Sequence, residues 1–304
     1  MKLLGLRLCE HDSNISYFDG TKLHYYKSER DYQIKHHGYD DLITWRDDIQ
    51  RIFGVKPNEI DDIAIVIDPW QHNFPTDNEE FFPAIDYPLF KADCPVQRIN
   101  HHYAHALSCF PVNNKIPDVE VVIDGFGEIN NAWTVFKDNK VFERGYEKEH
   151  GSPGVEMFLA GKWLNIEYKE GSEYDIAGKL MGLQAYGNHI EEFAKILPQS
   201  ILRTNDIFDK EKWFRFVGNE LVGTLKPLDW IRTVHNHMGD VLVKFFERIT
   251  DNDYNSIITY SGGVAQNVIW NTKLKNKFPN LIIPPHCNDE GLSLGAIEYL
   301  RIKH

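Results

Sequence analysis

Three side chains in this 304-residue sequence have the types and spacing of a divalent-metal site. His101 and His105 are four residues apart in a region whose residues 103–110 are predicted to form a short helix. Side chains at this spacing lie on one face of a helix, so both imidazoles can reach one point. Asp124 follows the apolar run 119–123, where a buried strand is predicted to enter a glycine turn. Imidazole and carboxylate groups are ligands that divalent metals accept, although core histidines and a turn aspartate would give the same pattern.

A glycine loop is the second segment whose residues could bind a ligand. Residues 261–267 read Ser-Gly-Gly-Val-Ala-Gln-Asn, after a predicted strand at 256–260 and before a predicted helix at 265–274. Glycines at such a junction let backbone amides approach an anion, and a helix N-terminus favours negative charge. A tight turn would explain the glycines equally well. The residues assigned to phosphate or nucleotide binding are Ser261, Gly262, Gly263 and Asn267.

A carboxylate and a lysine occupy further candidate positions. Asp289 stands before the predicted closing helix 291–301, where it either caps that helix or gives the metal a second carboxylate. Lys179 lies between Gly178 and Gly182, a setting that suits a point charge reaching a phosphate. The competing interpretation of Lys179 is an ordinary solvated lysine.

Polar residues also follow the first and third predicted strands. His11 and Asp12 lie shortly after the strand at 3–8, and we expect His11 first, or else Asp12 or an unassigned neighbour, to accept a proton. Arg30 and Lys35 follow the strand at 22–27. Together with Arg98 they are the candidates for a basic pocket around a phosphate, although an exposed loop is the simpler interpretation.

The elements that must position these residues form a repeated pattern. Three short strands joined by turns occur twice, and each set is followed by alternating helices and strands. The six strands are predicted at 3–8, 15–18, 22–27, 119–123, 132–136 and 141–146. The pattern predicts a duplicated α/β architecture with lobes at 1–112 and 113–304. Ligands in such folds bind outside the strand ends, so we expect the site in a central cleft.

Composition narrows the class of protein. The formal net charge is −12 and basic residues are not clustered, which argues against a duplex nucleic-acid partner. The four cysteines are scattered, as expected for reduced thiols in a cytosolic protein. We find no signal peptide or membrane-spanning stretch, so the sequence predicts a cytoplasmic protein without a membrane partner.

Taken in order, the motifs resemble the O-carbamoyltransferase family, which includes nodulation-factor and aminoglycoside-tailoring enzymes such as the tobramycin carbamoyltransferase. The matching segments are 4–6, 11–14, 28–30, 35–36, 100–106, 124–128, 178–183, 186–187, 261–267 and 289–291. The family is related to the tRNA threonylcarbamoyl-adenosine transferases. The resemblance implies the duplicated actin-like, Hsp70-ATPase-like fold of the ASKHA superfamily.

The resemblance also implies a ligand set and a reaction. One divalent ion, iron, manganese or magnesium, would be held by the set His101, His105, Asp124 and Asp289. The glycine loop would contact carbamoyl phosphate or an ATP- or AMP-derived moiety, and a carbamoyl group would pass to a hydroxyl. Longer members continue into a carbamoyl-adenylate synthase domain, which we expect to be absent here. Direct use of carbamoyl phosphate is therefore favoured over carbamoyl adenylate.

The expected mechanism has three parts. The metal positions the donor, while Lys179 and the amides of Gly262 and Gly263 neutralise the leaving phosphate. His11, Asp12 or an unassigned neighbour takes the proton of the acceptor hydroxyl. The acceptor is expected to be a small molecule such as a hydroxymethyl nucleotide or a sugar, and the sequence leaves a homodimer open. The alternatives are an ATP-dependent phosphotransferase of the same fold and a non-catalytic nucleotide-binding partner protein.

Overall fold

The chain forms two compact units in a computed structural model. The described residues are 1–8, 11–39, 41–67, 84–86, 92–113, 115–125, 127, 130–164, 166, 173–197, 202 and 225–304. The first unit comprises Met1–Ile116, Thr259–Gly262 and Ile282–His304. The second comprises Pro117–Ile258 and Gly263–Leu281.

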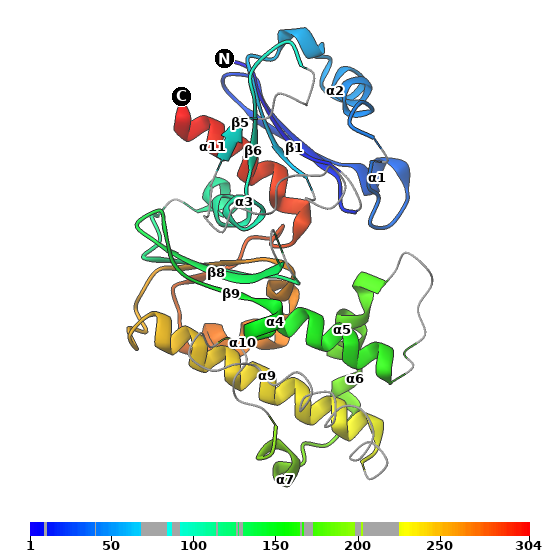
Figure 1. Cartoon of the computed structure of the whole chain (residues 1–304), viewed down its shortest axis with the longest axis vertical. Coiled ribbons are helices and arrows are strands. Elements are labelled where there is room, and N and C mark those ends of the chain that lie inside the picture. Colours follow the sequence, from blue (N-terminus) through cyan, green and yellow to red (C-terminus); the bar gives the residue numbers. More distant parts are fainter. Residues whose placement is uncertain are drawn as a thin grey trace. The chain divides into compact units, whose positions relative to one another are not determined.

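A six-stranded sheet is the centre of the first unit (Figure 1). Its order is β3-β2-β1-β4-β6-β5. The strands are β1 (Leu3–Arg7), β2 (Asn14–Phe18), β3 (Leu23–Lys27), β4 (Asp62–Val66), β5 (Ala84–Asp86) and β6 (Val96–Ile99). The first three strands pair antiparallel, which confirms the predicted opening meander, whereas β1, β4 and β6 run parallel.

Helices cover both faces of this sheet. They are α1 (Ser28–Tyr32), α2 (Trp45–Phe53), α3 (His101–Leu107) and α11 (Leu292–Lys303), with 3-10 turns η1 (Pro57–Glu59), η3 (Phe110–Val112) and η8 (Asp289–Gly291). Leu4 and Leu6 of β1 face a core that contains Trp45 of α2, whereas Leu3 faces a core that contains Ala104 and Ile297. Both faces of β1 are therefore buried, which explains its continuous apolar sequence.

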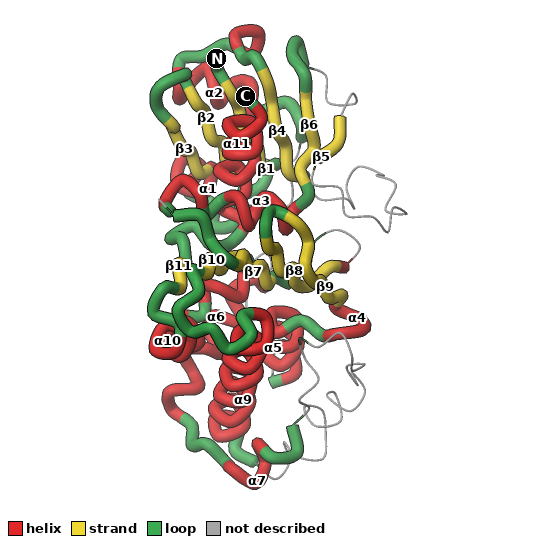
Figure 2. Tube along the Cα trace, turned by 90° about the vertical axis from the view of Figure 1, so that its left-hand side faces the viewer, coloured by secondary structure: helices red, strands yellow, loops and turns green. Residues whose placement is uncertain are grey.

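The other sheet has five strands, in the order β11-β10-β7-β8-β9 (Figure 2). Its strands are β7 (Val119–Ile123), β8 (Asn131–Lys137), β9 (Lys140–Tyr146), β10 (Ile258–Ser261) and β11 (Leu281–Ile282). The helices and turns of the second unit are α4 (Glu147–His150), α5 (Pro153–Trp163), η5 (Glu173–Asp175), α6 (Ile176–Leu183), η6 (Gln184–Tyr186), α7 (Glu191–Ala194), α9 (Pro227–Ile249), η7 (Gly263–Gln266) and α10 (Val268–Lys277). The second predicted meander is confirmed, because β7, β8 and β9 pair antiparallel in sequence.

The compact units differ from the expected division into 1–112 and 113–304. The closing helix α11 lies against β1 and β4 of the first unit (Figure 2). Its apolar side chains Leu292, Ala296 and Leu300 are fully buried there. Chain order alone could not assign α11 to this unit, because the contact joins the two ends of the sequence.

Two helix starts were misplaced by the sequence pattern. α3 begins at His101, two residues before the predicted start, because the Asn100 side chain accepts a hydrogen bond from Tyr103 N at 3.0 Å. The predicted helix 265–274 is divided into η7 and α10, because Asn267 caps α10 through Trp270 N at 3.1 Å. Much of the predicted surface excursion at 69–95 lies outside the described residues.

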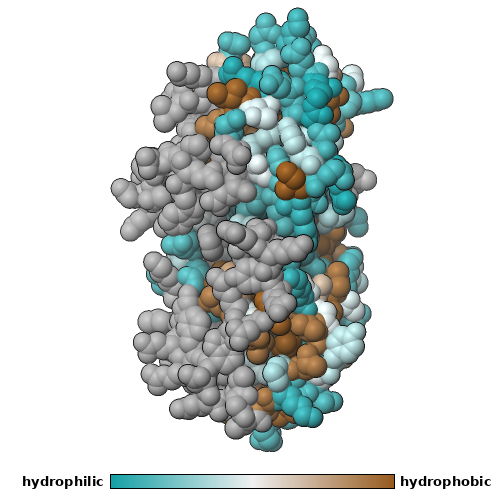
Figure 3. All heavy atoms as spheres, turned by 90° about the vertical axis from the view of Figure 1, so that its right-hand side faces the viewer, coloured by the Kyte–Doolittle hydropathy of each residue, from teal (hydrophilic) through white to brown (hydrophobic). Residues whose placement is uncertain are grey.

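None of the described helices combines the length and apolar character needed to cross a bilayer. Figure 3 shows mainly hydrophilic side chains on the visible face of the first unit and a gathering of apolar ones on the second. The described apolar residues that remain exposed in the second unit include Tyr174, Tyr186 and Leu228.

The contact between α3 and α11 generates a prediction about stability. A Cβ on Gly295 of α11 would lie 1.8 Å from the carbonyl oxygen of Ala104 in α3. We expect Gly295→Ala to lower the free energy of unfolding by about 1–3 kcal/mol, because the helices must separate. Urea unfolding measures this change.

Gly178→Ala is the matched control in a helix. A Cβ at Gly178 of α6 would meet no atom of the described structure within 4 Å. Alanine has the better helix propensity, so this variant should be as stable as the parent or more stable. Equal stability of the two variants would contradict the close packing of α11 on α3.

Candidate active site

Two imidazoles and a carboxylate form a compact triangle within the first unit. His101 Nε2 and His105 Nε2 lie 3.2 Å apart on one face of α3. Asp289 Oδ1, from η8, lies 3.5 Å from His101 Nε2 and 3.3 Å from His105 Nε2. The structure therefore brings three of the predicted metal ligands together from segments far apart in the sequence.

The dimensions of this triangle suit a divalent ion. Ligand atoms at about 2.0–2.1 Å from a tetrahedral ion are separated by about 3.3–3.4 Å, close to the three edges of 3.2, 3.3 and 3.5 Å. His105 is fully buried, and His101 and Asp289 are nearly so. A buried set of two imidazole nitrogens and one carboxylate oxygen is a donor set suited to iron, manganese or zinc.

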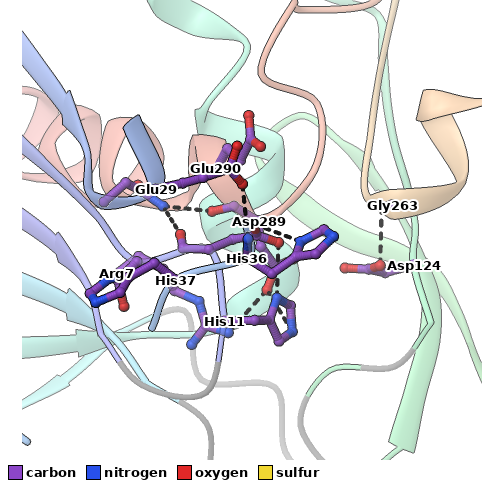
Figure 4. A network of polar contacts seen from close by, with 12 residues as sticks. Arg7, His11, Glu29, His36, His37, Asp124, Gly263, Asp289 and Glu290 are labelled. Atoms are coloured by element: carbon purple, nitrogen blue, oxygen red, sulfur yellow. Dashed lines mark hydrogen bonds and ion pairs between the residues drawn. The ribbon is translucent and has the colours of Figure 1, made fainter. Parts of the chain in front are cut away.

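Further side chains orient these three groups. Arg7 Nη2 donates to Asp289 Oδ2 at 3.0 Å, so the second carboxylate oxygen faces a buried guanidinium (Figure 4). Asn14 Nδ2 donates to the main-chain oxygen of Asp289 at 2.9 Å. Ser261 Oγ donates to the main-chain oxygen of His105 at 2.9 Å. Residues that support the ligands in this way commonly tune a metal site.

The charge on Asp289 follows from these neighbours. Burial alone would raise its pKa, but the charge and hydrogen bonds of His101 and His105, together with Arg7, hold the pKa of Asp289 well below its usual range. Asp289 is therefore a carboxylate, the form that ligates a metal.

A second hydrogen-bonded group lies beside the triangle. Asp12 Oδ2 is 3.0 Å from His11 Nδ1, and Asp12 Oδ1 is 3.0 Å from His36 Nδ1. His11 Nε2 is 3.9 Å from Asp289 Oδ2. The predicted proton acceptors His11 and Asp12 are thus next to the predicted metal ligand Asp289, as Figure 4 shows for the labelled His11, His36 and Asp289.

The two imidazoles determine the ionisation of Asp12. Burial would raise its pKa, but hydrogen bonds from His11 and His36 lower it to about 2. For His11, burial would lower the pKa, but the hydrogen bond to Asp12 and the charge of Asp289 raise it above its ordinary value. His11 is consequently a stronger base than an isolated imidazole.

Local packing and backbone conformation explain why both positions in the glycine loop are glycine. Gly262 has φ of +95°, a left-handed conformation that glycine adopts without strain, and its amide donates to Cys287 O at 2.6 Å. The Gly263 amide donates to Asp124 Oδ1 at 3.0 Å, and a Cβ there would lie 2.8 Å from that oxygen (Figure 4). Both amides predicted to bind phosphate therefore have protein acceptors.

Two other residues of this loop also make structural contacts. Asn267 caps α10 and places Nδ2 2.9 Å from His235 Nε2. Ser261 supports the His105 carbonyl as described above. The geometry thus gives no support to phosphate binding by these groups, and that role stays a prediction.

The remaining predicted site residues are not part of the triangle within the first unit. Asp124 belongs to the second unit, where Oδ1 also accepts from Gly125 N at 2.7 Å. Lys179 is exposed on α6 of the second unit, and Arg30 and Lys35 are exposed in the first. Their assigned roles stay predictions.

Sequence reasoning missed two site residues, Arg7 and His36. Arg7 is a charged residue inside an apolar strand and is fully buried. A buried arginine needs a carboxylate partner, so its position in the sequence was a usable signal. His36 belongs to the matching segment 35–36, but no role could be predicted for it, because its hydrogen bond to Asp12 depends on how the loop after α1 folds.

Solved structures with a similar fold support the fold class. The activator of the 2-hydroxyisocaproyl-CoA dehydratase from Clostridium difficile aligns with a TM-score of 0.58 and 14% identity over 100% of this chain and 95% of its own. Component A of the Acidaminococcus fermentans (R)-2-hydroxyglutaryl-CoA dehydratase aligns with a TM-score of 0.58 and 13% identity, over 98% of this chain and 97% of its own. Such low identity shows the fold alone, which is the predicted duplicated actin-like fold.

Two further proteins match over part of their length. HypF from T. kodakarensis has a TM-score of 0.61 and 14% identity, over 99% of this chain but 48% of its own. The uncharacterized protein MJ1051 of Methanocaldococcus jannaschii is 44% identical over 66 residues, which are 21% of this chain and 12% of that protein. The chain therefore spans about half of HypF, and its match to MJ1051 is local.

The model of the family described as carbamoyltransferase N-terminus matches residues 89–297. The matched region includes α3 with both histidines, Asp124, the glycine loop and Asp289. Because this match covers more than half of the sequence, the chain belongs to the carbamoyltransferase N-terminus family.

Proposed function

We propose that this protein is a metal-dependent O-carbamoyltransferase that uses carbamoyl phosphate, or carbamoyl adenylate, to modify a hydroxyl of a small molecule. The observation that carries the proposal is the buried triangle of His101, His105 and Asp289 in a chain of this family. Its dimensions suit a divalent ion, and His11, the predicted proton acceptor, lies beside it.

The proposed reaction is an acyl transfer without oxidation or reduction. The acceptor oxygen bonds to the carbonyl carbon of the donor, and the bond from that carbon to the phosphate oxygen breaks. The acceptor hydroxyl loses its proton, and the bonding electrons leave with the phosphate. The products are a carbamate ester and inorganic phosphate, or AMP when the donor is the adenylate.

The residues have distinct roles in this proposal. His101, His105 and Asp289 would hold the ion, with Asp124 as the predicted fourth ligand. A bound divalent ion supplies Lewis acidity that polarises an oxygen of the donor. Arg7 keeps Asp289 ionised and oriented, and His11 accepts the acceptor proton through Nε2. Lys179 stays the predicted partner of the leaving phosphate.

The acceptor is proposed to be a hydroxymethyl nucleotide or a sugar. Arg30 and Lys35 are exposed in the first unit, and Arg98 is largely buried on β6 of the same unit. Cationic side chains of this kind can meet the phosphate of a nucleotide acceptor.

Metal binding provides the first test. Purified protein loaded with Fe²⁺ or Mn²⁺ under anaerobic conditions should bind one ion per chain in the buried triangle. His105→Ala removes one ligand, so its affinity should fall at least about 100-fold, beyond the effect typical of supporting residues. Calorimetry and elemental analysis measure both quantities.

His24→Ala is the matched control, because His24 is a partly exposed imidazole paired with Asp19 at 3.0 Å. This variant should bind the ion as the parent does. If His105→Ala bound the ion as tightly as the parent protein does, the assignment of the triangle as the metal site would be contradicted.

Catalysis is tested separately by mass spectrometry. The protein is incubated with carbamoyl phosphate and a mixture of hydroxymethyl nucleotides and sugars, with and without ATP. We expect one acceptor to gain the mass of one carbamoyl group, with inorganic phosphate released. Product without ATP identifies carbamoyl phosphate as the direct donor, whereas a requirement for ATP identifies the adenylate. Formation of ADP and a phosphorylated acceptor without carbamoyl phosphate would replace this proposal with a phosphotransferase.

A further inference from the structure

The carboxylate of Asp12 lies between two imidazole rings of the first unit. Its two oxygens are each 3.0 Å from an Nδ1 atom, one in His11 and the other in His36. An ionised carboxylate only accepts hydrogen bonds, so both Nδ1 atoms must carry the proton. The opposite nitrogen of His11, Nε2, is then the atom that accepts a proton, and it points toward Asp289 at 3.9 Å.

We propose that His36 is a positioning residue for the transfer reaction: by binding Asp12 Oδ1, it fixes the carboxylate that orients His11. This role rests on the proposed function, because it assumes that His11 is the proton acceptor. Without His36, Asp12 could rotate about its side-chain bonds and offer either oxygen to His11. The His11 ring would then no longer be held in a single tautomer and a single orientation.

The backbone around His36 is built to hold this ring. Asp12 N donates to His36 O at 3.4 Å, and Ser13 N donates to His37 O at 2.9 Å. The side chain of Glu29 accepts from His36 N at 2.9 Å. Asp12 itself has φ of +53°, a conformation uncommon for residues other than glycine. Such a conformation persists only where its surroundings impose it, and it is common at functional sites.

Aromatic stacking fixes the residue that follows His36. The rings of His37 and Tyr32 are stacked with centroids 4.2 Å apart and planes inclined by 4°. Ser28 Oγ contacts both His37 O at 3.1 Å and Ser13 O at 2.7 Å. The loop after α1 is therefore attached on both sides of His36, which leaves the ring little freedom to turn away from Asp12.

A second cation site is the competing interpretation of this cluster. Ligand atoms of Asp12, Glu29 and His36 all lie within 4.8 Å of one another. However, both Asp12 oxygens already face imidazole nitrogens, and the Lys27 ammonium lies 3.5 Å from Glu29 Oε1. Positive charge is thus supplied by the protein itself, which favours the hydrogen-bonded arrangement over a bound ion.

Two substitutions separate the effect of the His36 hydrogen bond from the effect of its side-chain volume. His36→Leu removes the donor, whereas His36→Asn retains an N–H near the position of Nδ1. We expect His36→Leu to lower kcat roughly 10- to 100-fold, the range typical of supporting residues, with an unchanged KM for carbamoyl phosphate. His36→Asn should recover most of kcat. His24→Leu, at the hairpin pair with Asp19, should leave kcat unchanged.

Nitrogen-15 NMR of the histidine rings gives a readout that needs no turnover. At a pH high enough to make the rings neutral, the apoprotein should show His11 and His36 with the proton on Nδ1. The signals are assigned from their loss in His11→Asn and His36→Leu. In His36→Leu, the His11 ring should become a mixture of tautomers. This measurement separates failure of the positioning role from failure of carbamoyl transfer.

A proton on Nε2 of either ring in the wild-type apoprotein would overturn the inference, as would Zn²⁺ bound to His36 in His105→Ala protein. An unchanged His11 tautomer in His36→Leu would also overturn it. So would equal losses of kcat in the Leu and Asn variants, since only the Asn variant keeps the donor.

Discussion

The buried charge of Asp289 is the constraint on which the candidate site depends. Moving a carboxylate out of water costs several kcal/mol unless partners replace the lost hydration. Here Oδ1 faces His101 and His105, and Oδ2 accepts a hydrogen bond from Arg7. Each carboxylate oxygen therefore has polar partners that replace water. Because Arg7 binds Oδ2, Oδ1 is left facing both imidazoles. An ion bound there would further stabilise the buried negative charge.

The fold brings these groups together through packing on one face of a sheet. Arg7 ends β1, the histidines lie on α3, and Asp289 directly precedes α11. α11 contacts both β1 and α3, and Gly295 permits the close approach to Ala104. A shift between the two helices would therefore change the spacing of the ligands. The position of the carboxylate therefore depends on how closely α3 and α11 pack.

Much of this could be predicted from local sequence. Continuous apolar runs located the central strands, and the spacing of His101 and His105 placed both rings on one helix face. The partners of the glycine loop could not be predicted, because a Gly-Gly turn reads the same whether its amides meet a phosphate or a protein oxygen. The roles of Arg7 and His36 depend on contacts distant in sequence, so residue type alone identified only a charge in an apolar strand and a polar loop.

Membership of the carbamoyltransferase N-terminus family and the donor geometry lead to the same chemistry by separate routes. The family indicates carbamoyl transfer, and the triangle supplies a place where a divalent ion could act. The His11–Asp12–His36 group adds a basic nitrogen beside Asp289. We propose that a divalent ion binds between the two histidines and the Asp289 carboxylate.

X-ray absorption spectroscopy of the Fe²⁺-loaded protein tests that claim most directly. The account predicts a first shell of nitrogen and oxygen at about 2.0–2.2 Å, with the outer-shell scattering of two imidazole rings. The imidazole signal should weaken in His101→Ala and in His105→Ala protein. A first shell of oxygen alone, unchanged by either substitution, would contradict the account.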